Sequence, residues 1–506
     1  MILQYTILFI AVLFQYACTQ STTPINNNQI LSSSVSVNTY QYFYFTIPST
    51  TQFFRKRDYP PIHLTVSTCS QPQSSSSQSI PPVSIYLSTS SANTLPGPGN
   101  GITVDNSLNG LTSWTSDGTS SQLWIAVGGP SLENASGNWT FEIGVSINNP
   151  LHVVYQNEDR ADNSSIPYFI LDDTDRNNAL FLSSPFSGSA PNASILIASN
   201  LPSELTYSLC AAKLNAATNY SVNTTTTMRG STNSSKFQFM VSNLSQDTIY
   251  TAYMTQTVNG VTGMTTPIRM STKSDANCRI IYDLPFCDQV AYSVPVNPST
   301  FGTENIWDVA NQYDAQALEK FEPFSVALSQ FNCETTQYSL VRNCTDCYRD
   351  YKTWLCSVTI PRCTDSSSTA DLTQGTDDVV AAPALRDTSI NASRNPWIDE
   401  TMTPGEWTEL LPCIDLCYHV VQSCPPFLSF RCPTGDLRSV QYGYWQQGLG
   451  TANGTTYRFD INNPTCNRMG VSPQQLVIST ALKMAPTMTI VICTSLSLLF
   501  IIYDVL

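Results

Sequence analysis

Residues 347–363 read CYRDYKTWLCSVTIPRC, and residues 412–424 read PCIDLCYHVVQSC. Eight and then six residues separate the cysteines of the first stretch, and three and then six separate those of the second. Side chains four or seven positions apart lie on one face of an α-helix. The spacing therefore predicts two helices cross-braced through cysteines, with Cys356 and Cys363 projecting from one helix and Cys413, Cys417 and Cys424 from the other.

The cysteines are concentrated around these two stretches. Apart from Cys18 and Cys493 near the chain ends, 14 of the 16 cysteines remain, and 12 of them fall between residues 275 and 470. An even number of cysteines in a secreted chain is typical of disulfide pairing. Amphipathic segments over Ala315–Phe331 and Pro412–Cys424 add a helical pattern. We therefore predict that residues 275–470 form a mainly α-helical, disulfide-rich domain.

Both ends of the chain are apolar. Residues 1–19 are predicted to be a secretory signal peptide. Residues 471–506 contain 19 uncharged residues, 485–503, which fit either a membrane-spanning helix or a lipid-anchor signal. In the second case Ser479 is a candidate anchor position among small residues. Either interpretation places residues 20–480 outside the cell at the plasma membrane, after passage through the endoplasmic reticulum.

Asn-x-Ser/Thr triplets support this location. Behind a signal peptide many of them carry sugar, which requires exposed loops. We predict a glycoprotein, with eleven candidate sites: Asn134, Asn138, Asn163, Asn192, Asn219, Asn223, Asn233, Asn243, Asn343, Asn391 and Asn453.

Residues 20–150 show the pattern of an all-β domain. Trp139, Phe141, Ile143, Val145 and Ile147 alternate with polar residues, which is the period of a half-buried strand. Loops rich in Ser, Pro and Gly separate further short apolar runs. We expect a β-sandwich or jelly roll with strands at Tyr40–Ile47, Val83–Leu87, Leu123–Val127 and Trp139–Ile147.

Residues 151–274 predict a second β-sandwich, because seven short strand patterns lie between 165 and 274. Leu244-Ser-Gln-Asp-Thr-Ile-Tyr250 resembles the signature of fibronectin type III domains, with Gln246 in place of the usual proline. The resemblance implies that the Tyr250 hydroxyl bonds to the backbone at a strand corner. Cys69 and Cys210, one in each β unit, either bridge the units or remain buried thiols. The expected strands are Tyr168–Leu171, Ala179–Leu182, Ser194–Ala198, Leu205–Ala211, Phe237–Val241, Thr248–Thr255 and Pro267–Ser271.

The composition argues against catalysis and nucleic-acid binding. The chain has 506 residues, 23 basic against 37 acidic side chains, a net charge of −14 and only three histidines. No basic patch is available to displace the counterions of a nucleic acid, and few imidazoles are available for acid–base work or zinc. We predict a protein that is not an enzyme and holds no cofactor or metal. Cys344-Thr-Asp-Cys347 is interpreted as structural, His419 as a packed helix residue and Asp173–Asn177 as a turn between strands, not a calcium loop.

The cysteine pattern resembles that of the frizzled cysteine-rich domain, since Pro361-Arg-Cys363 and Pro412-Cys413 also match this family. Cys278 and Cys287 match its opening, and Cys432 and Cys466 complete ten cysteines. Cys333 and Cys344 lie outside the family pattern and are expected to form an extra bridge. The resemblance implies the pairs Cys278–Cys363, Cys287–Cys356, Cys347–Cys424, Cys413–Cys466 and Cys417–Cys432.

The order of a signal peptide, a glycosylated β region and a frizzled-like domain resembles the fungal stretch-activated calcium-channel component. This resemblance implies an extracellular auxiliary or regulatory subunit of a calcium-permeable cation channel in the plasma membrane. Its partner would be a large four-repeat pore-forming subunit, and it would support stretch-activated calcium influx. Tethering between membrane and cell wall is one hypothesis for stretch sensitivity.

Two other classes of function fit the same layout. A receptor-like glycoprotein would bind a lipid or another ligand in the groove of the frizzled-like domain. A lipid-anchored cell-wall protein would normally carry a long repetitive stalk, which the sequence lacks.

Overall fold

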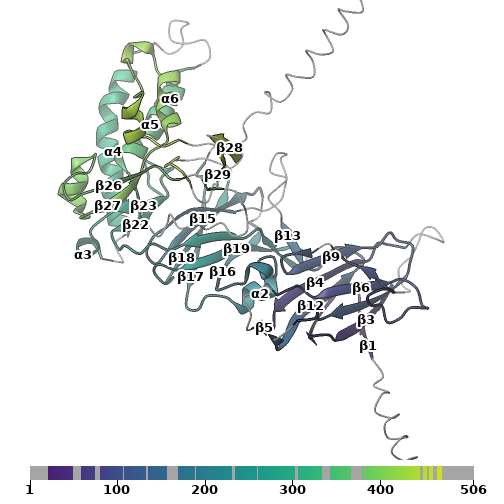
Figure 1. Cartoon of the computed structure of the whole chain (residues 1–506). Coiled ribbons are helices and arrows are strands. Elements are labelled where there is room, and N and C mark those ends of the chain that lie inside the picture. The colour runs from purple at the N-terminus through teal and green to yellow at the C-terminus, as the bar shows by residue number, and fades with distance from the viewer. Residues whose placement is uncertain are drawn as a thin grey trace, which may run out of the picture.

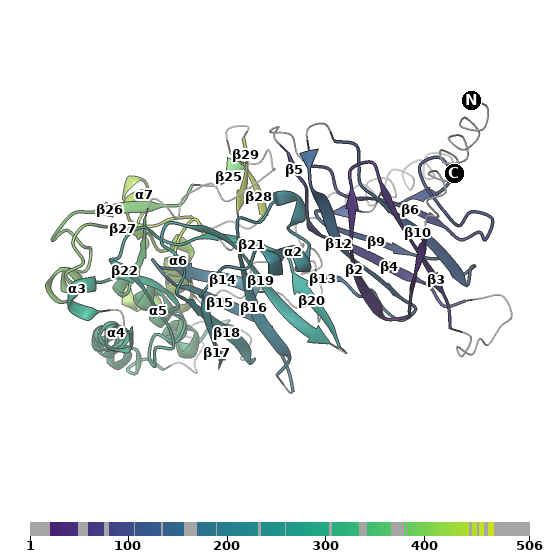
Figure 2. The same ribbon diagram turned by 90° about the horizontal axis from the view of Figure 1, so that it is seen from below.

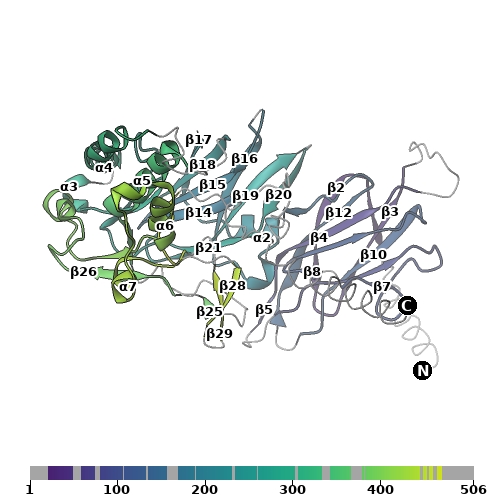
Figure 3. The same ribbon diagram turned by 90° about the horizontal axis from the view of Figure 1, so that it is seen from above.

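The structure is a computed structural model of the whole chain, and three folded units follow one another along it (Figures 1 and 2). The first unit lies at one end and helices α4, α5 and α6 at the other, in all three views (Figure 3). The structure describes residues 21–48, 59–74, 80–105, 107–132, 135–155, 169–188, 190–230, 234–258, 260–302, 306–332, 342–365, 379–380, 382–444, 448–452, 455–459 and 464–469. The predicted signal peptide and C-terminal hydrophobic segment lie outside these residues.

The first unit consists of two five-stranded sheets packed face to face. Strand β12 shows why they pair: Trp139, Phe141, Ile143 and Val145 are all buried in the core between the sheets. The rings of Phe43 and Phe141 meet edge to face at 6.2 Å. One sheet runs β1 (Thr22–Ile25), β3 (Tyr40–Thr46), β10 (Gln122–Gly128), β6 (Ser84–Ser88), β7 (Ile102–Thr103). The other runs β2 (Gln29–Ser36), β12 (Asn138–Ser146), β4 (His63–Ser70), β9 (Leu111–Thr115), β8 (Ser107–Leu108), and β5 (Gln73–Ser74) pairs with β11 (Ala135–Ser136).

The second unit also has two sheets. The first runs β13 (Val153–Tyr155), β20 (Val261–Thr265), β19 (Ile249–Val258), β16 (Asn192–Ser199), and β21 (Ile268–Ser271) pairs with β19. The second runs β14 (Phe169–Thr174), β15 (Ala179–Pro185), β18 (Lys236–Ser242), β17 (Ser221–Thr227).

One strand expected in the second unit is absent from the described residues. Residues 203–205 and 209–214 form the short helices η2 (Ser203–Leu205) and α2 (Leu209–Leu214) instead of a strand at Leu205–Ala211. The reason is local, because the Ser208 hydroxyl caps α2 by accepting a hydrogen bond from the Ala211 N–H at 3.1 Å. The threonine-rich strand β17 was not expected, since its pattern lacks large apolar residues.

The corner expected at Tyr250 is present. Its ring is buried in the core of the second unit, and its hydroxyl accepts a hydrogen bond from the Ser245 N–H at 2.9 Å. Residue 245 begins the turn that leads into β19, so the bond fixes the direction in which the strand starts.

Replacing Tyr250 with Phe tests this corner. The Ser245 N–H would lose its acceptor in a partly buried position, which costs about 1–3 kcal/mol of local stability. We expect faster hydrogen exchange of the Ser245 amide and of β19 in Tyr250→Phe. Tyr44→Phe, at an exposed ring, is the matched control and should leave this exchange unchanged. Unchanged exchange in both variants would contradict the role of the hydroxyl.

The prediction of a mainly α-helical C-terminal domain is wrong. Helices alternate with short strands there, because buried four-residue segments such as CRII at 278–281 and WTEL at 407–410 pair as strands. The helices are α3 (Pro298–Phe301), α4 (Ile306–Leu328), α5 (Cys344–Thr359), the π-helical turn η4 (Ile398–Met402), α6 (Ile414–Ser423), η5 (Pro426–Leu428) and α7 (Asp436–Gln441). The sheets are β22 (Cys278–Ile281) with β23 (Tyr292–Pro295), then β24 (Arg362–Thr364), β27 (Trp407–Leu410), β26 (Leu385–Thr388), then β25 (Val379–Val380), β29 (Thr455–Phe459), β28 (Gly448–Ala452).

The cysteine spacing led to the wrong prediction because it indicates where helices begin and end, but not whether strands lie between them. Cys363 lies in β24 and not on a helix, since α5 ends before Pro361 and the residue before a proline avoids helical dihedrals. Cys413 and Cys424 are the N-cap and C-cap residues of α6, so only Cys417 projects from within that helix. Among the described residues, no helix combines the length and the apolar character that crossing a membrane requires.

Candidate functional site: the junctions between the units

The first junction joins β4 of the first unit to α2 of the second through a disulfide between Cys69 and Cys210. Of the two alternatives left open by the sequence, bridge or buried thiols, the structure contains the bridge. Beside it the hydroxyl oxygens of Ser67 and Ser208 lie 2.9 Å apart in a buried hydrogen bond. The Tyr207 N–H donates to the carbonyl of residue 109 at 2.9 Å. A covalent bond and polar contacts therefore hold the two units together.

Gly110 allows this close contact. Its φ is +96°, and a Cβ atom at this position would lie 2.9 Å from the Leu205 Cα of the second unit. Any other side chain would both strain the backbone and push the two units apart.

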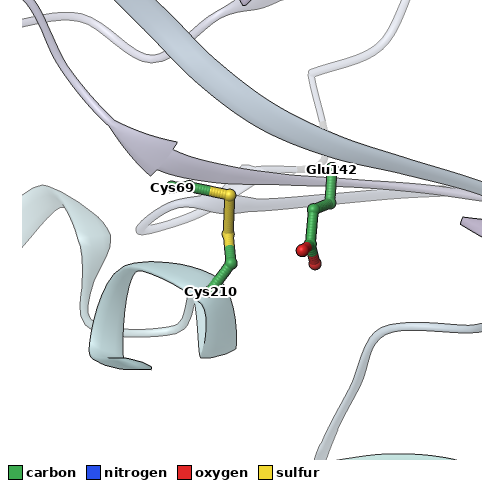
Figure 4. A group of neighbouring side chains, drawn as sticks. All are labelled: Cys69, Glu142 and Cys210. Carbon is green, nitrogen blue, oxygen red and sulfur yellow. A yellow bond between two sulfur atoms is a disulfide. The ribbon is translucent and has the colours of Figure 1, made fainter. Parts of the chain in front are cut away.

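Glu142 lies beside this disulfide, as Figure 4 shows, and the two sulfur atoms and a carboxylate oxygen lie within 4.8 Å of one another. The three residues could hold a metal ion only if the sulfurs were thiolates, and here they are bonded to each other. His152 Nε2 lies 3.4 Å from the Glu142 carboxylate, and its Nδ1 lies 2.8 Å from the Thr65 hydroxyl. The hydrogen bond with His152 lowers the pKa of Glu142 despite partial burial.

The second junction, which joins the second unit to the cysteine-rich region, is built around a buried carboxylate. Asp173, on β14, lies 2.8 Å from the Lys273 ammonium and 3.0 Å from Arg362 Nε. The Ser293 N–H on β23 donates to the same carboxylate at 2.8 Å. Lys273 also donates to the carbonyl of Thr174. The second unit supplies Asp173 and Lys273, whereas Ser293 and Arg362 come from the cysteine-rich region.

The charges of this cluster balance the cost of burial. Burial alone would raise the pKa of Asp173, but Arg362, Lys273 and the Ser293 N–H outweigh it and hold the pKa below its usual range. The neighbouring Asp175 shows the opposite outcome. Burial raises the pKa of Asp175. The groups that bond to it, from Asn177, Asn178 and the Ile280 backbone, are mainly neutral and do not offset the effect of burial.

Apolar packing lies next to the charged cluster, since Leu180 pairs with Asp173 and Ile280 pairs with Ser293 in the sheets. Leu180 and Met240 of the second unit pack against Ile280, Tyr282 and Ala291 of the cysteine-rich region. Further polar contacts cross the boundary. For example, Arg362 Nη2 donates to the Asp172 carbonyl at 2.7 Å, and the Ser274 N–H donates to the Asp365 carboxylate at 2.7 Å. Apolar packing beside buried charges fixes one orientation of the two units.

The disulfides of the cysteine-rich region have the pairing that the frizzled resemblance implied. The structure joins Cys278–Cys363, Cys287–Cys356, Cys347–Cys424, Cys413–Cys466 and Cys417–Cys432. Cys344 is also disulfide-bonded, while its expected partner Cys333 lies outside the described residues. Cys344 and Cys347 are therefore both oxidised, which agrees with a structural role for this pair.

The other predicted site residues do not form one site among the described residues. Seven candidate glycosylation sites are exposed, namely Asn138, Asn192, Asn219, Asn223, Asn243, Asn343 and Asn391. Asn134, Asn163, Asn233, Asn453 and the anchor candidate Ser479 lie outside the described residues. His419 is exposed on α6, so the expectation of a packed histidine is wrong. Asp173–Asn177 spans the end of β14 and the turn into β15, as expected.

The charged junction was not predicted from the sequence. One signal was present, since only 12% of residues are charged and Lys273 closely follows the expected strand Pro267–Ser271. Nothing in the sequence indicates, however, that Lys273 and Arg362 meet at Asp173.

The comparisons with known proteins agree with the family resemblance. The model of the family described as stretch-activated Ca²⁺-permeable channel component matches residues 61–471. The chain is 36% identical over 267 residues to the stretch-activated cation channel yam8 of Schizosaccharomyces pombe, covering 50% of this chain and 51% of yam8. It is 32% identical over 254 residues to the stretch-activated cation channel MID1 of Saccharomyces cerevisiae, covering 47% of this chain and 41% of that protein.

A third relative is matched over a longer region. The stretch-activated cation channel MID1 of Cryptococcus neoformans is 24% identical over 413 residues, covering 66% of this chain and 63% of that protein. The matches thus span about half the length of the first two relatives. The family model nevertheless covers most of the chain, including both junctions and all six disulfides described above. The chain belongs to the family of stretch-activated Ca²⁺-permeable channel components.

Proposed function

We propose that this protein is an extracellular auxiliary subunit of a calcium-permeable cation channel in the plasma membrane. Its partner is a large four-repeat pore-forming subunit, and it supports stretch-activated calcium influx. The observation that carries the proposal is the family match over residues 61–471, which includes both junctions.

The disulfides support the extracellular placement. Six bridges join residues 15 to 141 positions apart. Bonds of this kind persist in oxidising compartments, whereas the thiols of cytosolic proteins are kept reduced. Seven exposed glycosylation triplets fit the same placement.

The junctions support a mechanical role. A subunit that responds to stretch has to carry force from one end to the other without yielding at the boundaries between its units. Here one boundary is joined by a covalent bond and the other by a buried ion cluster next to apolar packing.

The proposal is tested in a Saccharomyces cerevisiae strain that lacks MID1. We expect the full chain to restore swelling-induced calcium influx and to co-purify from detergent membranes with a large multi-span protein. A variant with a weakened first junction, Cys69→Ser with Cys210→Ser, should keep the partner but lose most of the influx. Absence of the multi-span partner would overturn the auxiliary role, and normal influx in the junction variant would overturn the mechanical role.

A further inference from the structure

The helical end of the cysteine-rich region exposes apolar side chains that would normally be covered. Cys347, near the start of α5, is bonded to Cys424 at the end of α6, and Leu328 at the end of α4 belongs to the same buried cluster. The C-terminal ends of α4 and α6 and the N-terminal end of α5 therefore meet at one place, on the side of the molecule away from the first unit (Figure 1). We call the exposed residues Tyr348, Val421 and Phe427 the helical tip.

The helical tip is strongly exposed. Phe427 is 80% exposed, Val421 is 44% exposed and Tyr348 is 41% exposed. The Phe427 ring is stacked on Phe331 at 6.4 Å, and Tyr348 meets the buried Phe321 at 4.8 Å, so the aromatic core continues to the surface here. Exposed apolar patches of this kind usually mark a contact or an aggregation hazard.

A glycosylation triplet, Asn343-Cys344-Thr345, stands at the same end. Asn343 is the N-cap residue of α5, and Cys344 packs in the cluster that contains Phe331 and Leu428. The Asn343 Oδ1 atom accepts from the Asp346 N–H at 3.1 Å, and the Asp346 carboxylate accepts from the Asn343 N–H at 3.1 Å. This capping box fixes the side chain.

The cap leaves the attachment atom available. Among the hydrogen bonds of the described residues, none uses Asn343 Nδ2, the nitrogen to which an N-linked sugar is joined. The amide oxygen keeps its role as acceptor after glycosylation, so the cap and the sugar are compatible. Asp would cap the helix as well as Asn, so the cap alone does not require an asparagine.

We propose that Asn343 carries an N-linked glycan whose first sugars lie over the helical tip. The C–H faces of the sugar rings would contact the rings of Phe427 and Tyr348. The sugar hydroxyls would face solvent, so that a polar, hydrated surface covers the apolar side chains. The occupant of this patch is thus a covalent part of the glycoprotein. The inference rests on the secretory placement in the proposed function.

The test distinguishes the effect of the sugar from the effect of the helix cap. The full chain is produced in a glycosylating host, its peptides are mapped by mass with and without enzymatic glycan removal, and binding of a hydrophobic dye is measured. Asn343→Asp keeps the cap but removes the attachment site. Thr345→Val removes the triplet at an exposed residue but keeps Asn343, and Thr345→Ser keeps both.

We expect an occupied Asn343 in the wild type and in Thr345→Ser. Asn343→Asp and Thr345→Val should raise dye fluorescence at least about twofold, because the apolar patch is uncovered. Adding Phe427→Ser to Thr345→Val should reverse the rise. An unoccupied Asn343 beside occupied sites such as Asn192 would overturn the inference but leave the secretory placement intact, whereas no occupied site anywhere would overturn both. An occupied Asn343 without any change in dye binding would show that the sugar does not cover the tip.

Discussion

Asp173→Asn is expected to destabilise the contact between the second unit and the cysteine-rich region by about 3–5 kcal/mol, because it leaves two buried cations without their anion. The amide has nearly the shape of the carboxylate, so the loss comes from charge and not from packing. Lys273 and Arg362, at 2.8 and 3.0 Å from the carboxylate, would then face each other across a neutral group. Hydrogen exchange of the β14, β22 and β23 amides measures the effect, and exchange should rise in all three strands together.

A double-mutant cycle assigns the loss to the ion cluster. Lys273→Met should be costly in the wild type, where it leaves Asp173 with one cation, and less costly in the Asp173→Asn background. A coupling of about 0.5–3 kcal/mol is typical of residues in one ionic network. Asp105→Ala, at an exposed aspartate, should stay within about 0.5 kcal/mol of the wild type. Additive effects of the first two substitutions would contradict a shared cluster.

The pH dependence of stability provides a second test of the charge on Asp173. The folded-state pKa of Asp173 lies below its ordinary value, so the carboxylate contributes stability above the unfolded-state pKa of about 3.9. That contribution is lost as the pH falls through the folded-state pKa. The difference in stability between wild type and Asp173→Asn should therefore shrink as the pH falls below about 4. A constant difference down to the folded-state pKa would contradict the ionised state of Asp173.

How well the sequence predicts each part of the structure depends on whether the pattern that indicates it is local or involves residues far apart in the chain. Alternation along β12 and the tyrosine corner at Tyr250 are local patterns, and both appear in the structure. The disulfide pairs come from cysteine spacing interpreted through a family resemblance. The mixed helix and strand content of the cysteine-rich region was missed, because three- and four-residue buried strands carry no period that distinguishes them from turns.

The charged junction was missed for a different reason, because it is formed by residues far apart in the chain. Asp173 and Lys273 are 100 residues apart, and Arg362 belongs to another unit. Each is an ordinary charged residue in the sequence, and only tertiary packing buries them together. The Cys69–Cys210 bridge is an intermediate case, since two cysteines in separate units limited the alternatives to two.

Removal of that bridge is the second large effect that we expect. Cys69 and Cys210 are 141 residues apart, and in the chain-entropy model a cross-link closing a loop of this length contributes about 5 kcal/mol. The variant Cys69→Ser with Cys210→Ser keeps small polar groups beside Ser67 and Ser208, so local packing changes little. We expect the first unit to separate from α2, with faster exchange of the Tyr207 amide that bonds to residue 109.

The matched control is the short bridge within the cysteine-rich region. Cys417 and Cys432 are 15 residues apart, so Cys417→Ser with Cys432→Ser should cost about 3 kcal/mol and should leave the Tyr207 amide protected. Both variants remove one disulfide, but only the first removes a bond between units. If the Tyr207 amide exchanges equally slowly in the two variants, the hydrogen bonds and the close contact at Gly110 hold the junction without the disulfide. If it exchanges faster only in the first, the covalent bond is the element that makes the two β units one mechanical body.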